Sequence, residues 1–310
     1  RRPKGRAAKI MGILQMGIAQ VLYLDVPDFA AVSTSVDLAR QSGLAGHTKL
    51  VNAIMRRVVG GGRALLATLD SEKLNTPTWM WDSWTATYGE ATCRAIAKAH
   101  TDGAKIDISV KTDPASWAVK LDGELLPTGS IRLSGGGMIE SLAGYEDGQW
   151  WVQDAAAALP VKLLGDVNGK TIADLCAAPG GKTMQLVAAG ASVTAIDRSK
   201  KRLKVLHRNL YRTHLKATVL TEKAEDWKPD ELLDGVLLDA PCSATGTLRR
   251  HPDIAFQKSP DDIASLTAIQ DRLLVAALEM VKPGGLVIYC TCSLQPEESE
   301  TLIANALANG

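Results

Sequence analysis

The sequence predicts a multidomain protein in which a helical segment and a small α+β segment precede an α/β segment with a mainly parallel sheet. Three observations support this prediction. Apolar residues recur at helical spacing near the start, short alternating runs follow, and from Lys170 onward strand-like runs alternate with helical periodicity. A chain of 310 residues is long enough for two or three domains. We place these domains at residues 1–68, 69–160 and 161–310.

The first domain is expected to be a small helical unit with a basic surface. Apolar residues repeat every three or four positions over residues 9–24 and 51–58, which is typical of amphipathic helices. Between them, residues 32–35 predict the N-terminal cap of a third helix, and Gly60–Gly62 are expected to end the unit. Residues 1–63 contain ten Lys or Arg against three Asp. Such a cluster suits a polyanion, although solvated helix faces explain it equally well.

The second domain has a different composition. Trp81, Trp84 and Tyr88 have helical spacing, which favours packing between domains over stacking on nucleobases. Residues 106–110 and 117–121 alternate like strands and are separated by turn signals. We therefore expect a small α+β unit with hairpins.

The third domain has the most regular pattern. Its helical periodicity alternates with five strand-like runs, at residues 171–175, 192–196, 217–221, 235–239 and 285–291. This alternation implies right-handed crossovers and a largely parallel sheet with helices on both faces. In such sheets ligands bind beyond the carboxyl ends of the strands, so the residues that follow each strand are the informative ones.

Residues 174–183, Asp-Leu-Cys-Ala-Ala-Pro-Gly-Gly-Lys-Thr, follow the first strand and lead into a helix. Two adjacent glycines allow the backbone to approach a ligand, and the start of the helix offers free N–H groups and a positive dipole end. An anionic or nucleotide-like ligand is therefore expected. A phosphate-binding P-loop would require glycine at position 176, where the sequence has Cys176.

Acidic and thiol side chains follow the other strands. Asp197 can accept hydrogen bonds from a ribose diol, and a role as the cap of the next helix is compatible with this. Cys242 and Cys292 follow neighbouring strands and are expected to face one pocket that also contains Asp239. A lone cysteine is usually inert core, but a thiolate favoured by Lys182 can add to an electron-poor ring, and a second thiol can help to remove the adduct.

The cysteine content, the apolar runs and the charge exclude several classes of protein. The five cysteines are odd in number, which indicates reduced thiols in a cytoplasmic protein rather than a disulfide framework. The pair Cys290 and Cys292 lacks the spacing and histidine partners of a zinc site, so no metal is predicted. No apolar run is long enough to span a membrane. The net charge of +1 indicates no partner by itself, but residues 198–216 contain eight Lys or Arg and no acid.

Four motifs together resemble the RsmB/Nop2/Sun family of RNA cytosine-C5 methyltransferases. They are residues 174–183, residues 238–247 (Leu-Asp-Ala-Pro-Cys-Ser-Ala-Thr-Gly-Thr), residues 249–253 (Arg-Arg-His-Pro-Asp) and residues 289–298, which contain Tyr-Cys-Thr-Cys-Ser and Pro-Glu-Glu. The resemblance implies a Rossmann-like methyltransferase domain. It extends upstream, where the helical segment with residues 24–27 (Leu-Asp-Val-Pro), 31–33 (Ala-Val-Ser) and 51–53 (Val-Asn-Ala) resembles a NusB-like domain, and the middle unit with residues 151–154 (Trp-Val-Gln-Asp) resembles an RRM-like domain. The resemblance also implies that the chain is a fragment that lacks both ends of a longer protein.

The resemblance further implies roles for individual residues. S-adenosylmethionine would be bound by Cys176, Ala177, Ala178, Pro179, Gly180, Gly181, Lys182, Asp197, Arg202 and Asp239. Cys292 would attack C6 of cytosine, Cys242 would assist loss of the C5 proton and release of the enzyme, Asp239 would bind the edge of the base, and Lys182 would lie beside it. The implied partner is RNA, in particular small-subunit rRNA in a single-stranded or opened region, bound by a monomer. The basic helix after Arg198 and the turn at Arg249 and Arg250 would bind phosphates.

One position departs from the family pattern. An acidic residue commonly follows the third strand and contacts the adenosine, but this sequence has Lys223 there, and Glu222, Glu225 and Asp226 all remain candidates. Two other functions also remain open. One is a DNA cytosine-C5 methyltransferase in which Cys242 is the nucleophile, and the other is a non-catalytic RNA-binding or ribosome-assembly factor.

Overall fold

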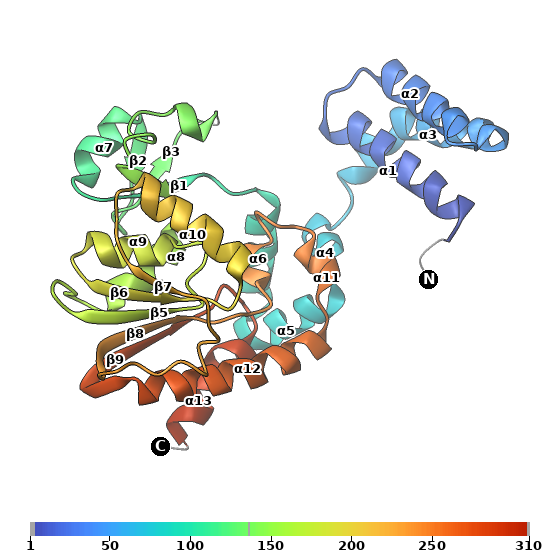
Figure 1. Cartoon of the computed structure of the whole chain (residues 1–310). Coiled ribbons are helices and arrows are strands. Elements are labelled where there is room, and N and C mark those ends of the chain that lie inside the picture. Colours follow the sequence, from blue (N-terminus) through green and yellow to red (C-terminus); the bar gives the residue numbers. More distant parts are fainter. Residues whose placement is uncertain (1–3, 136, 309–310) are drawn as a thin grey trace. The chain divides into compact units, whose positions relative to one another are not determined.

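The computed structural model describes residues 4–135 and 137–308, which form two compact units, one ending at Leu74 and the other beginning at Asn75 (Figure 1). No helix within these described ranges has the length and apolar character needed to cross a membrane. Each unit is described by itself below.

The first unit is helical, as predicted. It consists of α1 (Arg6–Tyr23), α2 (Asp28–Gln41), η1 (Ala45–His47), α3 (Thr48–Leu66) and the short α4 (Ser71–Asn75), which extends to the boundary. The apolar faces of α1, α2 and α3 form one core, made of Ile13, Leu14, Val21, Ala31, Ala39, Leu44, Val51 and Met55. Gly17 allows the close approach of these helices, because a Cβ at this position would lie 2.3 Å from Ser35 Oγ and 2.8 Å from Met55 Sδ.

Two local predictions for this unit are wrong. Helix α2 begins at Asp28 after Pro27, and Ser35 lies inside it, where its hydroxyl donates to the carbonyl oxygen of Ala31 at 2.7 Å. The acidic Asp28 in the first turn suits the positive end of the helix dipole. Helix α3 continues through Gly60–Gly62 to Leu66. A Cβ at Gly62 would lie 3.3 Å from Leu22 Cδ2, so the absence of a side chain lets α3 pack closely on α1. This packing compensates for the low helix propensity of glycine.

The second unit begins with α5 (Thr78–Tyr88) and α6 (Glu90–Thr101). Trp81 and Trp84 are buried in a cluster with Met80 and Cys93, and this cluster includes Leu248 and Ala255 from the far end of the chain. The tryptophans therefore pack α5 and α6 against the α/β part, as their helical spacing predicted.

A four-stranded antiparallel sheet follows. Its elements are β1 (Asp107–Val110), α7 (Pro114–Lys120), β2 (Gly123–Leu125), β3 (Ile131–Leu133), η2 (Ile139–Ser141) and β4 (Trp150–Val152), in the strand order β2-β3-β1-β4. The prediction of a strand at residues 117–121 is wrong, because most of this run lies in α7. Asp113 caps α7 by accepting a hydrogen bond from the Ser116 backbone N–H, and Pro114 occupies the first turn.

The rest of the second unit is the predicted α/β sheet. All five strands are parallel in the order β7-β6-β5-β8-β9, and the strands are β5 (Thr171–Leu175), β6 (Ser192–Ile196), β7 (Thr218–Leu220), β8 (Leu233–Asp239) and β9 (Val281–Cys290). The helical elements around them are α8 (Ala155–Leu163), α9 (Gly181–Ala188), α10 (Lys200–Arg212), η3 (Thr245–Thr247), α11 (Ile254–Gln257), α12 (Pro260–Glu279), η4 (Pro296–Glu298) and α13 (Glu300–Ala308).

Helices cover both faces of this sheet (Figure 1). One face is covered by α9 and α10, which contribute Met184, Leu203 and Leu206 to a core. The other face is covered by α12 and α13, which contribute Leu273, Ala277 and Leu302 to the largest core cluster. The chain runs outward from β5 through β6 to β7 and then returns to β8 on the other side of β5. This reversal creates a crevice at the carboxyl ends of β5 and β8, where ligands of α/β proteins bind.

Candidate functional site

A cavity of about 610 Å³ lies at the carboxyl ends of β5, β6 and β8. Its lining includes polar side chains from the loops after these strands and apolar side chains from α12, among them Ile196, Asp197, Arg202, Glu225, Asp239, Cys242, Ile269, Leu273 and Cys292. Both the volume and this mixture of apolar walls with a few acceptors are typical of small-molecule sites.

The loop after β5 is held tightly at the edge of this cavity. Cys176 has φ +61°, which turns the chain, and the Ala177 backbone N–H donates to the carbonyl oxygen of Ile196 at 3.0 Å. Gly180 has φ +105°, and a Cβ there would lie 2.9 Å from Leu206 Cγ on α10. Glycine is therefore required both by the backbone conformation and by the close approach of α10. Burial raises the pKa of the Cys176 thiol to about 12, so this thiol stays protonated.

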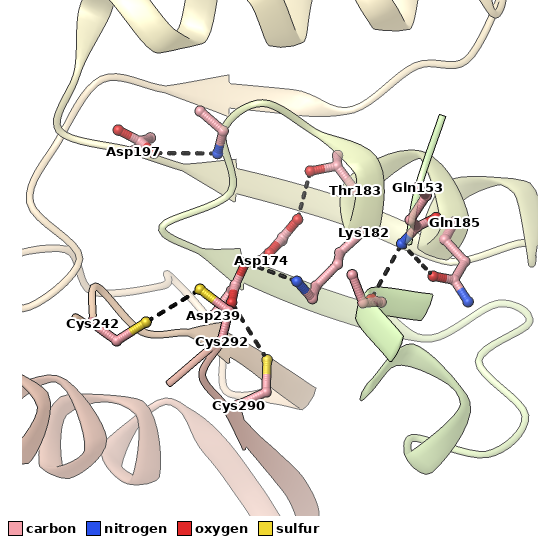
Figure 2. A network of polar contacts seen from close by, with 12 residues as sticks. Gln153, Asp174, Lys182, Thr183, Gln185, Asp197, Asp239, Cys242, Cys290 and Cys292 are labelled. Atoms are coloured by element: carbon pink, nitrogen blue, oxygen red, sulfur yellow. Dashed lines mark hydrogen bonds and ion pairs between the residues drawn. The ribbon is translucent and has the colours of Figure 1, made fainter. Parts of the chain in front are cut away.

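Asp197 connects the β5 loop with the start of α10. It is 3% exposed, and its carboxylate accepts a hydrogen bond from the backbone N–H of Ala178 at 3.2 Å, drawn as a dashed line at Asp197 in Figure 2. It also accepts from the backbone N–H of Ser199 at 2.8 Å. The Arg202 guanidinium lies 3.4 Å from this carboxylate and also donates to the Ala178 carbonyl oxygen. The interpretation that Asp197 caps the helix is wrong, because Ser199 Oγ accepts from the Arg202 N–H and is the cap of α10.

Lys182 and Asp239 form an ion pair across the site. Lys182 Nζ lies 2.8 Å from Asp239 Oδ2, and the lysine side chain is 13% exposed (Figure 2). Burial is the largest single effect and lowers the pKa of Lys182, but the charge and hydrogen bond of Asp239, with further contributions from Cys290 and Asp174, together outweigh burial and raise this pKa. The ammonium group is therefore a permanent charge beside Asp239. The Cys290 thiol, which sequence reasoning left unassigned, also contacts Asp239, with Sγ 3.7 Å from Oδ1.

The two strand-end thiols meet in this site, as predicted. Cys242 Sγ lies 3.4 Å from Cys292 Sγ (Figure 2). The hydrogen bond between them lowers the pKa of Cys292 and raises that of Cys242, with burial adding to the rise at Cys242. Cys292 is therefore the thiol that ionises first, with Cys242 donating to it. Lys182 also favours the Cys292 thiolate through its charge.

A second cavity of about 280 Å³ lies on the other side of Cys292. Asp239 and Cys292 line both cavities, whereas Lys182, Cys290, Arg249 and Arg250 line only the smaller one. Both arginines pair with Asp154, at 2.7 Å for Arg250. Two adjoining cavities that share a thiol and a carboxylate can hold two reactants on either side of one nucleophile.

Asp174 lies beneath the site and is fully buried. Its Oδ2 accepts a hydrogen bond from Thr183 Oγ1 at 2.5 Å, whereas its Oδ1 has no partner among the described residues. Burial is the main cause that raises the pKa of Asp174 to about 7, and the hydrogen bond from Thr183 and the charge of Lys182 oppose this rise. The folded protein therefore binds a proton at Asp174 that the unfolded chain loses at lower pH.

Asp174→Asn is expected to stabilise the protein above neutral pH. A carboxyl group whose pKa is raised from 3.8 to about 7 on folding makes stability fall as pH rises between these values. The amide removes this loss, so the free energy of unfolding at pH 8 should increase by about 1–4 kcal/mol. Urea unfolding at about pH 5 and pH 8 measures it. The exposed Asp230→Asn is the control, and a variant that shows the wild-type pH dependence would contradict the prediction.

The positions of the predicted residues divide between the two cavities. Cys176, Asp197, Arg202, Asp239, Cys242 and Cys292 line the larger cavity, and Lys182 lines the smaller one. Ala177, Ala178, Pro179, Gly180 and Gly181 form the loop and the helix start but line neither cavity. Of the acids near Lys223, only Glu225 lines the larger cavity, whereas Lys223 pairs with Asp226 at 3.7 Å. In the described part of the chain, no cluster of three or more His, Cys, Asp or Glu suits a metal ion.

Sequence reasoning missed the buried polar residues behind the thiols. Glu298 and Gln270 are fully buried, and Ser243 joins them in one hydrogen-bonded network. In the sequence the Pro-Glu-Glu run is only part of a motif, and nothing in a single sequence shows which of its two carboxylates is buried. Gln270 is buried among the apolar residues of α12, and the helical periodicity of this segment does not predict a buried polar contact.

The sequence is similar to two protein families and to curated relatives. The family model described as 16S rRNA methyltransferase RsmB/F matches residues 161–310, and the NusB family model matches residues 3–60. The chain is 36% identical to the probable ribosomal RNA small subunit methyltransferase B of Synechocystis over 99% of its own length and 74% of the relative. It is 34% identical to the ribosomal RNA small subunit methyltransferase B of Xylella fastidiosa, over 99% and 76% respectively.

Solved structures share the fold. A methyltransferase homologue from Pyrococcus horikoshii superposes with a TM-score of 0.67 at 27% identity, covering 78% of this chain and 82% of that one. NSun6 from the same organism, solved with SFG, an analogue of S-adenosylmethionine, superposes with a TM-score of 0.67 at 18% identity, covering 76% and 88% respectively.

Proposed function

The chain belongs to the RsmB/F family of S-adenosylmethionine-dependent 16S rRNA methyltransferases, and from this premise we propose that it methylates C5 of a cytosine in small-subunit rRNA through a two-cysteine mechanism. The observation that carries the proposal is the pair Cys242 and Cys292, with sulfurs 3.4 Å apart beside two cavities that share Cys292 and Asp239. One cavity would hold the methyl donor and the other would hold the base.

The larger cavity fits S-adenosylmethionine. Its apolar walls, Ile196, Ile269 and Leu273, suit an adenine ring, and the carboxylate of Asp197 can accept hydrogen bonds from ribose hydroxyls. The main chain of residues 176–181 and the side chain of Arg202 would complete the binding site. When bound, this group supplies an electrophilic methyl. Glu225 is our choice for the acid that contacts the adenosine, because it lines the cavity and Asp226 does not.

Glu225→Ala is therefore expected to weaken binding of S-adenosylmethionine. Loss of a hydrogen bond to a charged acceptor typically costs about 1.5–3 kcal/mol, so the dissociation constant should rise by about tenfold or more. Isothermal titration calorimetry measures it, with Asp226→Ala as the matched control because that carboxylate is exposed and pairs with Lys223. Equal affinities of the two variants would show that Glu225 makes no contact with the cofactor.

The smaller cavity would hold the target cytosine. Asp239 would bind the edge of the base there, and the hydrogen bond from the ammonium group of Lys182 would orient its carboxylate. The Cys292 thiolate would add to C6, which makes C5 nucleophilic towards the methyl group. C5 would take the methyl group, with S-adenosylhomocysteine as the leaving group. The thiolate of Cys242 would then remove the C5 proton, and the bond between Cys292 and C6 would break to restore the aromatic ring and the Cys292 thiolate.

The antiparallel sheet would be an RRM-like domain that positions the RNA site without stacking bases itself. The proposal is supported by its order, β2-β3-β1-β4, with α7 connecting β1 to β2, which is the split βαβ arrangement. The face opposite α7 is covered, however. Trp151 is 2% exposed and packs with Ala177 and Leu206, and Asp107 on this face is paired with Arg132 at 2.8 Å. We propose that this domain extends over residues 69–160, between a NusB-like domain at 1–68 and the methyltransferase domain at 161–310.

RNA phosphates would be bound by exposed cations in both units. In the second unit, Lys200, Lys201, Lys204 and Arg208 are exposed on α10, close to the larger cavity. In the first unit, Arg56 lies beside the exposed Phe29 at a cavity of about 360 Å³, a combination that suits a single-stranded nucleotide. Arg249 and Arg250 are already paired with Asp154, so a phosphate would have to compete with this carboxylate.

Bisulfite sequencing of rRNA from cells with and without the gene tests the proposed function. We expect one cytosine of the small-subunit rRNA to be protected in cells with the gene and converted in cells without it. Transfer of labelled methyl to duplex DNA but not to rRNA would instead favour the DNA enzyme. Unchanged protection in the deletion strain would contradict the reaction proposed here.

A further inference from the structure

Glu298 is a fully buried carboxylate between the two loops that carry Cys242 and Cys292. Its Oε1 accepts hydrogen bonds from the Ser243 backbone N–H at 2.9 Å and from Gln270 Nε2 at 3.0 Å, and its Oε2 accepts from the Ser243 hydroxyl. A buried carboxylate is unfavourable unless hydrogen bonds satisfy it. These three donors satisfy it, and two of them belong to the residue next to Cys242.

The same network also holds the residue on the other side of Cys242. Gln270 Nε2, which donates to Glu298, also donates to the carbonyl oxygen of Pro241 at 2.9 Å. Pro241 and Ser243 are therefore both fixed by one carboxylate and one amide. The Cys242 side chain projects from a segment that is held at both ends.

A chain of hydroxyl groups extends this network to the loop of Cys292. Ser243 Oγ lies 3.0 Å from Ser293 Oγ, and Ser293 Oγ lies 3.2 Å from Thr245 Oγ1. Because the Ser243 hydroxyl donates its proton to Glu298, it must accept from Ser293, which in turn accepts from Thr245. Thr245 Oγ1 also accepts from the Leu294 backbone N–H at 2.9 Å. The carboxylate thus fixes the direction of the hydrogen bonds among these three hydroxyl groups, whereas the Gly246 backbone N–H joins the two loops independently by donating to the Cys292 carbonyl oxygen at 2.9 Å.

We propose that Glu298 is a positioning residue that sets the distance between the Cys242 and Cys292 sulfurs and thereby the rate of the step in which Cys242 acts. This inference rests on the two-cysteine function proposed above. Glu298 holds the Cys242 segment directly and the Cys292 segment only through hydroxyl groups, so its loss acts mainly on Cys242. A displacement of about 1 Å in a reacting group can slow a reaction by about a hundredfold.

The first test measures geometry without requiring activity. Diamide oxidises two adjacent thiols to a disulfide, as each sulfur gives up one hydrogen and the N=N bond takes both to become a hydrazine. We expect the Cys242–Cys292 disulfide, followed by peptide mass spectrometry of the full chain, to form about tenfold or more slowly in Glu298→Gln than in wild type. Glu297→Gln, a change to the exposed neighbouring carboxylate, should oxidise at the wild-type rate. Equal rates in all three proteins would overturn the inference.

The second test measures the reaction with small-subunit rRNA in a single turnover. Glu298→Gln should form the covalent adduct with RNA at close to the wild-type rate but release it about tenfold or more slowly, with affinity for S-adenosylmethionine unchanged. Ser243→Ala removes only the hydroxyl that donates to Glu298 and should show the same pattern. It serves as a second test variant if Glu298→Gln does not fold. If wild type transfers no methyl, the proposed function fails while the oxidation test still decides the geometry. If wild type is active and both variants release the adduct normally, the inference is wrong.

Discussion

Cys292→Ala is expected to abolish methyl transfer while leaving binding of S-adenosylmethionine intact. Cys292 is the thiol whose pKa is lowered, because the Cys242 thiol donates a hydrogen bond to it, so in the proposed mechanism Cys292 would supply the thiolate that adds to C6. Without this addition C5 of cytosine is a poor nucleophile, and removal of a covalent nucleophile typically lowers turnover by a factor of about 10⁴ or more. Labelled-methyl transfer to rRNA measures this loss, and calorimetry should give a dissociation constant for the cofactor within about twofold of wild type, well below the tenfold change of one lost charged hydrogen bond.

Cys93→Ala is the matched control for this experiment. Cys93 is fully buried on α6, lines neither of the two cavities beside Cys292, and its thiol donates to the carbonyl oxygen of Trp81 at 3.7 Å. This variant should therefore retain methyl transfer even if it loses a little stability. Full turnover by Cys292→Ala would rule out the two-cysteine mechanism, and loss of both activity and cofactor binding would show that Cys292 supports the larger cavity rather than the chemistry.

The sheet and the ends of its strands could be predicted because they depend on local patterns. Buried parallel strands are short apolar runs, and the side chains that follow them share one edge of the sheet whatever the helices between them do. The proximity of Cys242 and Cys292 followed from this argument alone. The alternating pattern of residues 117–121 wrongly predicted a strand. These residues lie mostly in α7, because Asp113 caps this helix and Pro114 occupies its first turn.

The network behind the thiols could not be predicted, because burial of a polar residue depends on contacts between distant segments. Glu297 and Glu298 are adjacent and chemically identical, yet only Glu298 points into the protein, where it meets Gln270 from α12 and Ser243 from the loop after β8. Asp197 and Ser199 are both common capping residues, and only the path of the β5 loop assigns the cap to Ser199. The acids near Lys223 were likewise separated only by the position of Glu225 in the cavity.

Cys242→Ala is expected to trap a covalent complex with RNA. The hydrogen bond to Cys292 is the main cause that raises the pKa of Cys242, so Cys242 stays protonated while Cys292 is a free thiolate. Once the Cys292 sulfur is bonded to C6 it carries no negative charge, and the pKa of Cys242 should fall towards its ordinary value. Cys242 can then lose its own proton to solvent, and its thiolate can act as the base that removes the C5 proton. Without it the methylated adduct should persist, so that turnover stops after one cycle and a labelled RNA–protein species survives denaturing electrophoresis.

The two single variants together determine which sulfur attacks. If Cys292 is the nucleophile, the adduct accumulates in Cys242→Ala and is absent from Cys292→Ala and from the double variant. If the order were that of the DNA enzymes, the adduct would accumulate in Cys292→Ala instead. The sulfurs are only 3.4 Å apart, so either could reach the same ring carbon, and distance alone does not assign the roles. The assignment rests on the resemblance of the Thr-Cys motif at Cys292 to the family, and the opposite pKa shifts of the two thiols agree with it.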